Sequence, residues 1–241
     1  MMALAVVLGG GSLAYFAVCL AWAEGPRLLD LHLSPPAALA WNALASAIFF
    51  AQHSVLVRRP VRSRLAAVIK ARYDGAFYAI TSGLALLPAA VLLQPAGPAL
   101  FVLHGVARAL VIASASLASA IFAWAIVVLR SFDPFGLRPI RRHLRDGDAP
   151  PAPPPDAASR FVVRGPYRWV RHPLYLAMIV LLWADPSMTP ARLELALLWT
   201  AWIFVGARLE ERDLAADLGD PYRSYRERVP MLIPWRRPAA R

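Results

Sequence analysis

Long apolar runs separated by short polar connectors restrict this chain to helices that cross a membrane. A bilayer core of about 30 Å needs roughly 20 residues at 1.5 Å per helical residue. The runs cover residues 1–23, 37–57, 75–93 and 99–129, with a fifth inside 190–213. With 59% hydrophobic and only 17% charged residues, the 241-residue chain is too apolar for an ordinary soluble domain. We therefore predict an all-α fold, a polytopic transmembrane helical bundle embedded in a lipid bilayer.

Basic loops indicate the orientation of these spans. The loop from Arg58 to Asp74 carries six basic residues against one Asp, and the segment from Arg130 to His172 is also strongly basic. Because arginine and lysine collect in cytoplasmic loops, we predict that both segments and both chain termini are cytoplasmic. The same distribution accounts for the net charge of +11, so we do not expect a nucleic-acid partner.

The first apolar run and the single cysteine narrow the possibilities further. The run has no basic n-region and no convincing small-residue cleavage site, so we interpret it as a retained span and not as a signal peptide. Cys19 lies inside this run, which excludes a disulfide framework or a cysteine-rich metal site within one chain. We predict no metal site.

The C-terminal part is predicted to form a helical hairpin. The apolar run from Pro173 to Trp183 is too short to span a bilayer, and Pro190 starts another helix that extends to about Asp213. We thus expect five full spans plus a short helix that completes this hairpin. The chain divides into an N-terminal four-helix transmembrane region, a basic and proline-rich cytoplasmic loop, and the hairpin with its tail, at 1–130, 131–164 and 165–241.

The stretch RGPYRWVRHPLYLA, residues 164–177, places a polar cluster at a helix entrance. Pro173 suits the first turn of a helix, whose free amides and positive dipole end attract anions. Arg168, Arg171 and His172 lie beside that turn in the sequence. A basic, aromatic anchor next to a membrane span has the same composition, so both a binding site and an anchor remain open.

Two adjacent carboxylates, Glu210 and Glu211, stand where the last apolar helix reaches the membrane interface. Carboxylates there can bind a ribose diol, an ammonium or a sulfonium. They can equally be helix-end charges paired with Arg208 and Arg212, which would have little energetic consequence.

The combined pattern distinguishes these alternatives. GPYRWVRHPLYLA at 165–177 followed by LEERDLAADLGDPYRSYRERVPMLIPW at 209–235 resembles the signature of the isoprenylcysteine carboxyl methyltransferase superfamily of integral membrane methyltransferases. Further segments, FFAQHSVLVRRP at 49–60, SFDPFGLRPI at 131–140 and WADPSMT at 183–189, look like its bacterial thiol-methylating members and relatives associated with nitric oxide reduction. The resemblance implies S-adenosylmethionine as cofactor, bound on the cytoplasmic side of a bacterial inner membrane.

The resemblance also implies the roles of individual residues. Glu211 is expected to be the catalytic carboxylate, with Arg208 as its orienting partner. The expected cofactor-binding residues are Tyr167, Arg171, His172, Pro173, Tyr175, Glu210, Tyr222 and Tyr225. For the methyl acceptor we expect Gln52 and His53, which are also close enough to the basic loop to be merely interfacial.

Three departures from the family pattern concern the substrate and the loop. Ala177 replaces the usual Gly, prolines are inserted at 150–155, and Gly206 stands where some carboxyl-methylating relatives carry an arginine. A small or lipophilic thiol is therefore the favoured acceptor, with an isoprenylcysteine-like carboxylate as the alternative. A non-catalytic membrane accessory protein and a haem or quinone binder are the other function classes.

Overall fold

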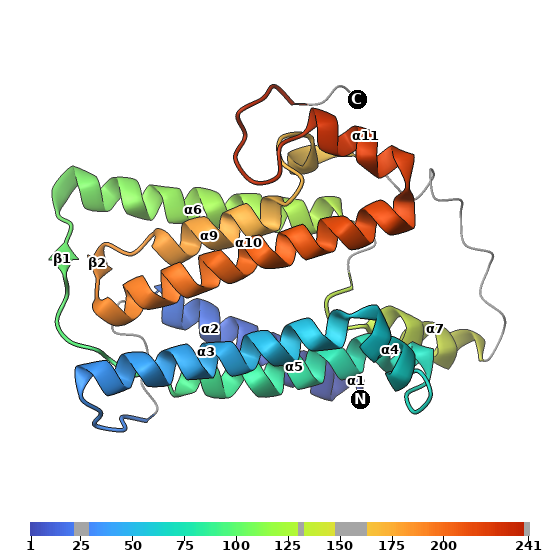
Figure 1. Ribbon diagram of the computed structural model, residues 1–241, viewed down its shortest axis with the longest axis horizontal. Coiled ribbons are helices and arrows are strands. Elements are labelled where there is room, and N and C mark those ends of the chain that lie inside the picture. Colours follow the sequence, from blue (N-terminus) through green and yellow to red (C-terminus); the bar gives the residue numbers. More distant parts are fainter. Residues whose placement is uncertain (22–28, 130–132, 148–162, 239–241) are drawn as a thin grey trace. The chain divides into compact units, whose positions relative to one another are not determined.

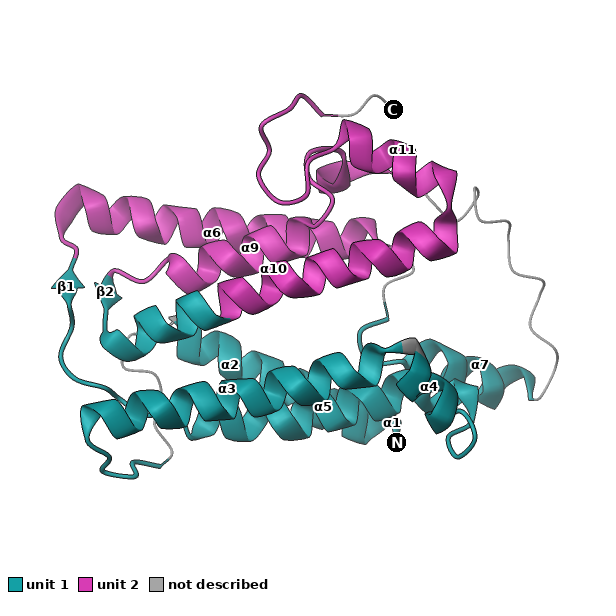
Figure 2. Ribbon diagram, in the orientation of Figure 1, with its two compact units in different colours: residues 1–102, 133–150, 187–198 teal, residues 103–132, 151–186, 199–241 magenta. Residues whose placement is uncertain are grey.

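The computed structural model describes residues 1–21, 29–129, 133–147 and 163–238 (Figure 1). These residues are predominantly helical, as predicted. They form two compact units that do not follow chain order, and Figure 2 shows the division. Unit 1 comprises residues 1–102, 133–150 and 187–198, and unit 2 comprises residues 103–132, 151–186 and 199–241. The proline insertion at 150–155, like half of the predicted 131–164 loop, lies outside the described residues.

Unit 1 is built from long apolar helices that pack on a central one, α5 (Asp74–Val91). The first span consists of α1 (Met2–Leu4), a π-helical segment η1 (Ala5–Gly10) and α2 (Gly11–Ala21). The second is α3 (Pro35–Val57). Both pack against α5 (Figure 1). A Cβ added at Gly83 would clash with the Leu8 carbonyl, so the first span and α5 approach as closely as backbones allow.

Shorter helices complete one end of unit 1. They are α4 (Arg59–Leu65), the 3₁₀ turn η2 (Ala71–Tyr73) and α7 (Leu137–Asp146). Asp133 begins α7 by accepting hydrogen bonds from the amides of Leu137 and Arg138 at 3.0 and 2.7 Å. Ile140 on α7 is buried with Ala76 of α5.

Buried amides hold the other end of unit 1 together. Gln94 is 1% exposed, and its backbone exchanges two hydrogen bonds with the Asn42 side chain of α3, at 2.9 and 2.8 Å. Its side chain also donates to the Leu29 carbonyl at 3.1 Å and accepts from the Leu31 amide at 2.8 Å. Arg192, near the start of α10 (Pro190–Leu218), donates to the Cys19 carbonyl at the end of α2.

One feature at this end was not predicted from the sequence. We expected the chain to turn at Gln94–Pro98 directly into a helix from residue 99. Instead β1 (Phe101–Val102) pairs antiparallel with β2 (Ser187–Met188), with Phe101 opposite Met188, and the fourth long helix, α6, begins only at Gly105. Ser187, the partner of Val102, lies 85 positions further along the chain, so the local sequence does not predict this pairing.

Unit 2 contains α6 (Gly105–Val128), the 3₁₀ turn η3 (Gly165–Arg168), α9 (Pro173–Trp183), most of α10 and α11 (Asp220–Arg228). Helix α9 packs on α6. The Trp183 indole donates to Thr200 at 3.0 Å, which joins α9 to α10. Gly165 adopts a φ of +54°, and a Cβ there would meet Val128 of α6 at 2.8 Å, so this turn requires glycine.

Four described helices are long and apolar enough to cross a membrane: Met2–Leu20, Pro35–Val57, Ala71–Val91 and Gly105–Val128. The short helix α9 has the predicted bounds. Helix α10, the predicted fifth span, is not among the four, and its uncharged part between Glu194 and Arg208 is limited to residues 195–207. It extends to Leu218, past the expected end near Asp213, and Gly219 ends it with a φ of +63°.

Candidate functional site

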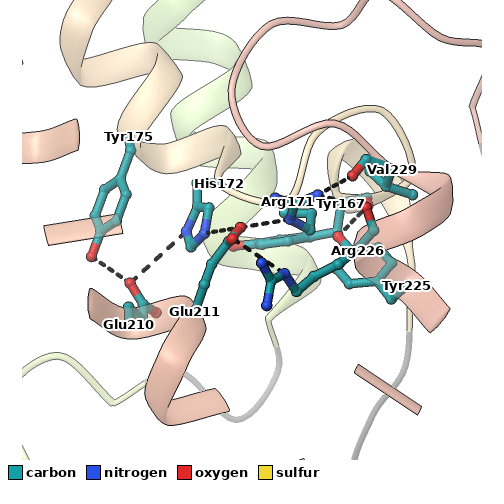
Figure 3. A network of polar contacts seen from close by, with 9 residues as sticks. All are labelled: Tyr167, Arg171, His172, Tyr175, Glu210, Glu211, Tyr225, Arg226 and Val229. Atoms are coloured by element: carbon teal, nitrogen blue, oxygen red, sulfur yellow. Dashed lines mark hydrogen bonds and ion pairs between the residues drawn. The ribbon is translucent and has the colours of Figure 1, made fainter. Parts of the chain in front are cut away.

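Three chain segments of unit 2 meet in one network of polar contacts, shown in Figure 3. The first runs from η3 to the start of α9, the second is the C-terminal part of α10, and the third is α11 with the residues after it. His172 is the N-cap residue of α9, and Pro173 occupies the first turn as expected. Because this helix start is fixed, the side chains of Arg171, His172 and Tyr175 all project toward α10.

The Arg171 guanidinium ties these segments together. Its Nε donates to Glu211 Oε1 at 2.6 Å, and both side chains are buried, with 9% and 6% exposed. Its Nη1 donates to the carbonyls of Arg226, at 2.9 Å, and Val229. The Arg171 and His172 amides donate to the carbonyls of Pro230 and Met231 at 2.9 and 3.1 Å. The tail is thereby fixed against the start of α9.

Glu211 is the charged centre of this network. Besides Arg171, its carboxylate contacts His172 Nε2 at 3.2 Å and Arg226 Nε at 3.5 Å. Burial alone would raise the pKa of the Glu211 carboxyl, but hydrogen bonds and positive charge from His172 and Arg171 outweigh it and lower the pKa to about 2. Glu211 is therefore a buried carboxylate whose charge is fully compensated within the chain.

Glu210 has the opposite character. It is 45% exposed, accepts a hydrogen bond from the Tyr175 hydroxyl at 2.7 Å, and lies 3.9 Å from His172 Nδ1. The rings of His172 and Tyr175 are stacked, with centroids 5.2 Å apart and planes 4° from parallel. The imidazole thus stands between the two carboxylates, with Glu211 on its buried side and Glu210 on its exposed side (Figure 3). Glu210 keeps hydrogen-bonding capacity for a bound molecule.

Three tyrosines line the same region. Tyr222 and Tyr225 are buried on α11 together with Val229, and the Tyr225 hydroxyl donates to the Tyr167 carbonyl at 2.6 Å. Burial raises the pKa of all three phenols, and the charge of Glu210 adds to the effect at Tyr167. They remain protonated at neutral pH and can therefore donate a hydrogen bond, as Tyr225 does.

The structure brings together nine of the residues singled out from the sequence. They are Tyr167, Arg171, His172, Pro173, Tyr175, Glu210, Glu211, Tyr222 and Tyr225. Arg208 is different: its guanidinium lies over the Phe204 ring, 4.6 Å from the centroid, and no described ion pair joins it to Glu211. Glu211 has Arg171 and His172 as partners instead, because its buried carboxylate meets the start of α9, whereas the Arg208 guanidinium packs on Phe204.

Arg226 and Val229 also belong to the network but were not predicted as site residues. Arg226 follows Tyr222 by four positions, so the two share a face of α11, and this spacing was the available signal. The role of Val229 rests on its carbonyl, which accepts from Arg171. Every residue has a main-chain carbonyl, so a sequence pattern does not predict a role of this kind.

The two residues expected to contact the acceptor, Gln52 and His53, lie on α3 in unit 1. His53 contacts two hydroxyls of α5, those of Tyr78, 2.9 Å from Nε2, and Ser82, 3.3 Å from Nδ1. The buried amide atoms of Gln52 have no hydrogen-bond partner among the described residues. In the described part of the chain, no three His, Cys, Asp or Glu side chains are grouped as metal ligands would be.

Known proteins resemble this chain over most of its length. The sequence model of the isoprenylcysteine carboxyl methyltransferase family matches residues 156–216. Methanethiol S-methyltransferase 1 of Bradyrhizobium diazoefficiens is 34% identical over 88% of this chain and 73% of its own length. Methanethiol S-methyltransferase of Mycobacterium tuberculosis is 32% identical over 96% of both chains. That of a Pseudomonas species is 34% identical over 86% of this chain and 79% of its own. No solved structure matches the chain significantly.

Proposed function

Because this chain belongs to the isoprenylcysteine carboxyl methyltransferase family and is a membrane methyltransferase, we propose that it transfers a methyl group from S-adenosylmethionine to a small thiol. The observation that carries the proposal is that two carboxylates of α10 lie beside the start of α9: Glu211, whose charge is compensated, and Glu210, which is available to a ligand. The names of the relatives support a thiol acceptor, since the three just described are all methanethiol S-methyltransferases.

The residues present fit this methyl donor. S-Adenosylmethionine combines a sulfonium, an amino-acid group and a ribose diol, and it supplies the electrophilic methyl group. Glu210 offers a carboxylate that is 45% exposed and suits a cation or a diol. Tyr175 and His172 would orient that carboxylate, while Tyr167 and Tyr222 provide protonated hydroxyls nearby.

The geometry supports roles for the two glutamates that differ from those expected from the sequence. We expected Glu211 to be the carboxylate at the reacting centre. Since its charge is compensated by Arg171, His172 and Arg226, we propose that Glu211 is a positioning residue. Glu210 then contacts the cofactor, and His172, which touches both carboxylates, links the two.

The main contribution of the protein to the reaction is to position the two substrates. When bound, S-adenosylmethionine would supply the methyl group, which would pass to the acceptor sulfur as the carbon–sulfur bond of the sulfonium breaks and S-adenosylhomocysteine is left; the thiol would give its proton to bulk solvent before the transfer. Positive charge disappears from the donor in this step, so a site that aligns the two sulfurs and excludes water suffices. The tail fixed by Arg171 over the start of α9 would contribute to that exclusion.

We also propose the finer membrane arrangement predicted from the sequence. Helix α10 would be the fifth span beside the four long apolar helices, and both termini would be cytoplasmic in a bacterial inner membrane. The basic loops support a cytoplasmic position for the polar network. Residues 165–241 would then form the cofactor-binding part, and residues 1–130 the N-terminal four-helix region.

Calorimetry with S-adenosylhomocysteine, the demethylated cofactor, tests the proposal. Detergent-purified wild type should bind it with micromolar affinity, and the His172→Ala and Glu210→Ala variants should lose that binding. His104→Ala, which alters an exposed histidine at the start of α6, is the matched control and should bind normally. A folded wild type without binding at millimolar ligand would favour an accessory protein, and turnover of prenylcysteine but no thiol would favour carboxyl methylation.

A further inference from the structure

We propose that the C-terminal loop, which we define as residues 229–237, is a membrane anchor of unit 2 that enters the lipid bilayer at the level of the phospholipid headgroups. Its partner is the bilayer itself. Acyl chains receive the Ile233 and Trp235 side chains, and lipid phosphates receive Arg236 and Arg237. This role is independent of the methyl donor and of the acceptor.

The base of the C-terminal loop is tied to unit 2 at two places. The carbonyls of residues 230–231 accept hydrogen bonds from the amides of residues 171–172, at 2.9 and 3.1 Å. Further along the chain, the Arg236 guanidinium donates to the Glu227 carbonyl of α11. The chain therefore leaves α11, bends and returns to it. The residues between the two ties have a defined position although they lie in no helix or strand.

Large apolar side chains are exposed at the tip of the loop. Ile233 is 70% exposed and Trp235 is 66% exposed. The Trp235 amide donates to the Ile233 carbonyl at 2.9 Å, so one tight turn carries both side chains. Apolar surface gains free energy when it is removed from water. Two such side chains on one fixed turn indicate a surface that an apolar phase covers.

Unit 2 holds the loop near the end of a membrane-spanning helix. Helix α6 is one of the four helices long and apolar enough to cross a membrane, and its last residue, Val128, packs against Gly165 of η3. The chain continues from η3 to residues 171–172, whose amides bind the loop. Trp235 follows Met231 by four positions and lies at most about 14 Å from it. Figure 1 shows the loop at the level of the last turns of α6, where that helix leaves the bilayer core.

Two further tryptophans mark the same level of unit 2. Trp124 lies on the last turns of α6 and borders Gly165, and Trp169 directly follows η3. Each is 48% exposed. Tryptophan is enriched where the hydrocarbon core meets the headgroups, because its ring is apolar and its indole N–H is polar. An interfacial position of Trp235 thus agrees with its surroundings.

The charge of the loop is suited to lipid phosphates. Residues 229–237 include Arg236 and Arg237 and no acidic residue. The Arg236 guanidinium lies over the Trp235 ring, 4.2 Å from its centroid, so a cation and an apolar ring are held together. The exposed Arg237 side chain has no ion pair with the described residues. Guanidinium groups bind phosphates well, and phospholipids offer phosphate and acyl chains together.

The loop connects this anchor to the polar network around Glu211. Besides the two main-chain hydrogen bonds, the Arg171 guanidinium donates to the carbonyl of Val229, which is 1% exposed. Arg171 in turn holds Glu211. Lipid that fixes the tip therefore also stabilises the start of α9, and a loop that leaves the bilayer would loosen these hydrogen bonds.

Spin labelling measures where the tip lies. The full chain is reconstituted in nanodiscs of phosphatidylcholine and phosphatidylglycerol, with the single native cysteine removed by Cys19→Ser. Ile233→Cys carries the nitroxide, and Ser224→Cys, at an exposed position of α11, is the matched control. Collisions with oxygen, which concentrates in lipid, are compared with collisions with a water-soluble nickel chelate. The label at position 233 should favour oxygen, and the label at position 224 should favour nickel.

Equal nickel accessibility at the two positions would overturn the inference. Shielding of position 233 from both reagents would overturn it as well, because a protein surface would then cover the loop. If Ile233→Cys does not fold, Trp235→Cys carries the same measurement.

Hydrogen exchange in the same nanodiscs tests the connection to the network. The amides of residues 171–172 donate to the loop, so their exchange reports on its release. A double variant, Ile233→Ser with Trp235→Ser, should accelerate this exchange about tenfold, the order of effect of a lost hydrogen bond. Leu144→Ser, which changes a residue of α7 that is 73% exposed, is the control and should exchange as wild type does. Unchanged exchange in the double variant would overturn the connection.

Discussion

The two polar centres of this protein, one in each unit, hold their side chains by different means. In unit 2, Arg171, His172 and Glu211 form a buried network of charges. In unit 1, His53 contacts two neutral hydroxyls inside a cavity with mainly apolar walls. At helix ends, where several chain segments meet, ion pairs can compensate buried charges. Within apolar helices a charged side chain costs free energy because no such partners are nearby. The comparison indicates that unit 2 holds its polar side chains by charge compensation, whereas unit 1 holds His53 by contacts with neutral hydroxyls.

The largest effect should come from removing the centre of the charged network. Glu211→Ala leaves Arg171 buried without its partner, which should destabilise the protein by about 3–5 kcal/mol. Asp220→Ala breaks an exposed ion pair with Arg223, 3.2 Å long, and should change stability by no more than about 1 kcal/mol. Thermal unfolding in detergent compares the two, and equal shifts would show that burial of the network contributes nothing.

Glu210→Gln should separate binding from stability. The side chain is 45% exposed, so unfolding should change little. Loss of a charged hydrogen-bond acceptor should weaken S-adenosylhomocysteine binding by about 2 kcal/mol, or roughly thirtyfold. Calorimetry gives the affinity. Normal affinity in a folded Glu210→Gln protein would return the ligand-contacting role to Glu211.

Lowering the pH should reduce the stability of unit 2, because Glu211 becomes protonated. Its pKa is about 2 in the folded state, below the 4.5 of the free group, so the carboxylate stabilises the fold fully above pH ~4.5 and less as the pH falls toward 2. The groups facing it are Arg171, His172 and Arg226, which Glu211→Gln retains. Between pH 5 and pH 3 wild type should lose about 1–2 kcal/mol more than this variant. Parallel unfolding curves of the two proteins over that range would contradict the role of the carboxylate.

The smallest effect is expected from Tyr175→Phe. The change removes the 2.7 Å hydrogen bond to Glu210 but keeps the ring stacked on His172. Cofactor affinity should fall by about 1 kcal/mol, or roughly fivefold. Tyr73→Phe, outside the network, serves as the control in the same titration, and a loss as large as that of Glu210→Gln would mean that Tyr175 contacts the ligand itself.

The sequence by itself determined where the long helices lie and which segments carry the chemistry. Apolar length predicted the four long membrane helices, and Pro173 and Trp183 marked the bounds of α9. These features depend on local composition and on the fixed geometry of proline, so they can be recognised without a partner. The family signature at 165–235 likewise pointed to seven residues of the polar network, whose roles in binding stay predictions: Tyr167, Arg171, His172, Tyr175, Glu210, Glu211 and Tyr225.

Only the tertiary structure decided how those residues divide their roles. Glu210 and Glu211 are adjacent, but successive helical residues point about 100° apart, so one is exposed and the other buried. Whether Arg208 or Arg171 pairs with Glu211 depends on which face of α10 meets α9. The cavity beside His53 and the pairing of β1 with β2 likewise join positions distant in the chain. Such contacts depend on packing between segments, which no local pattern of residues specifies.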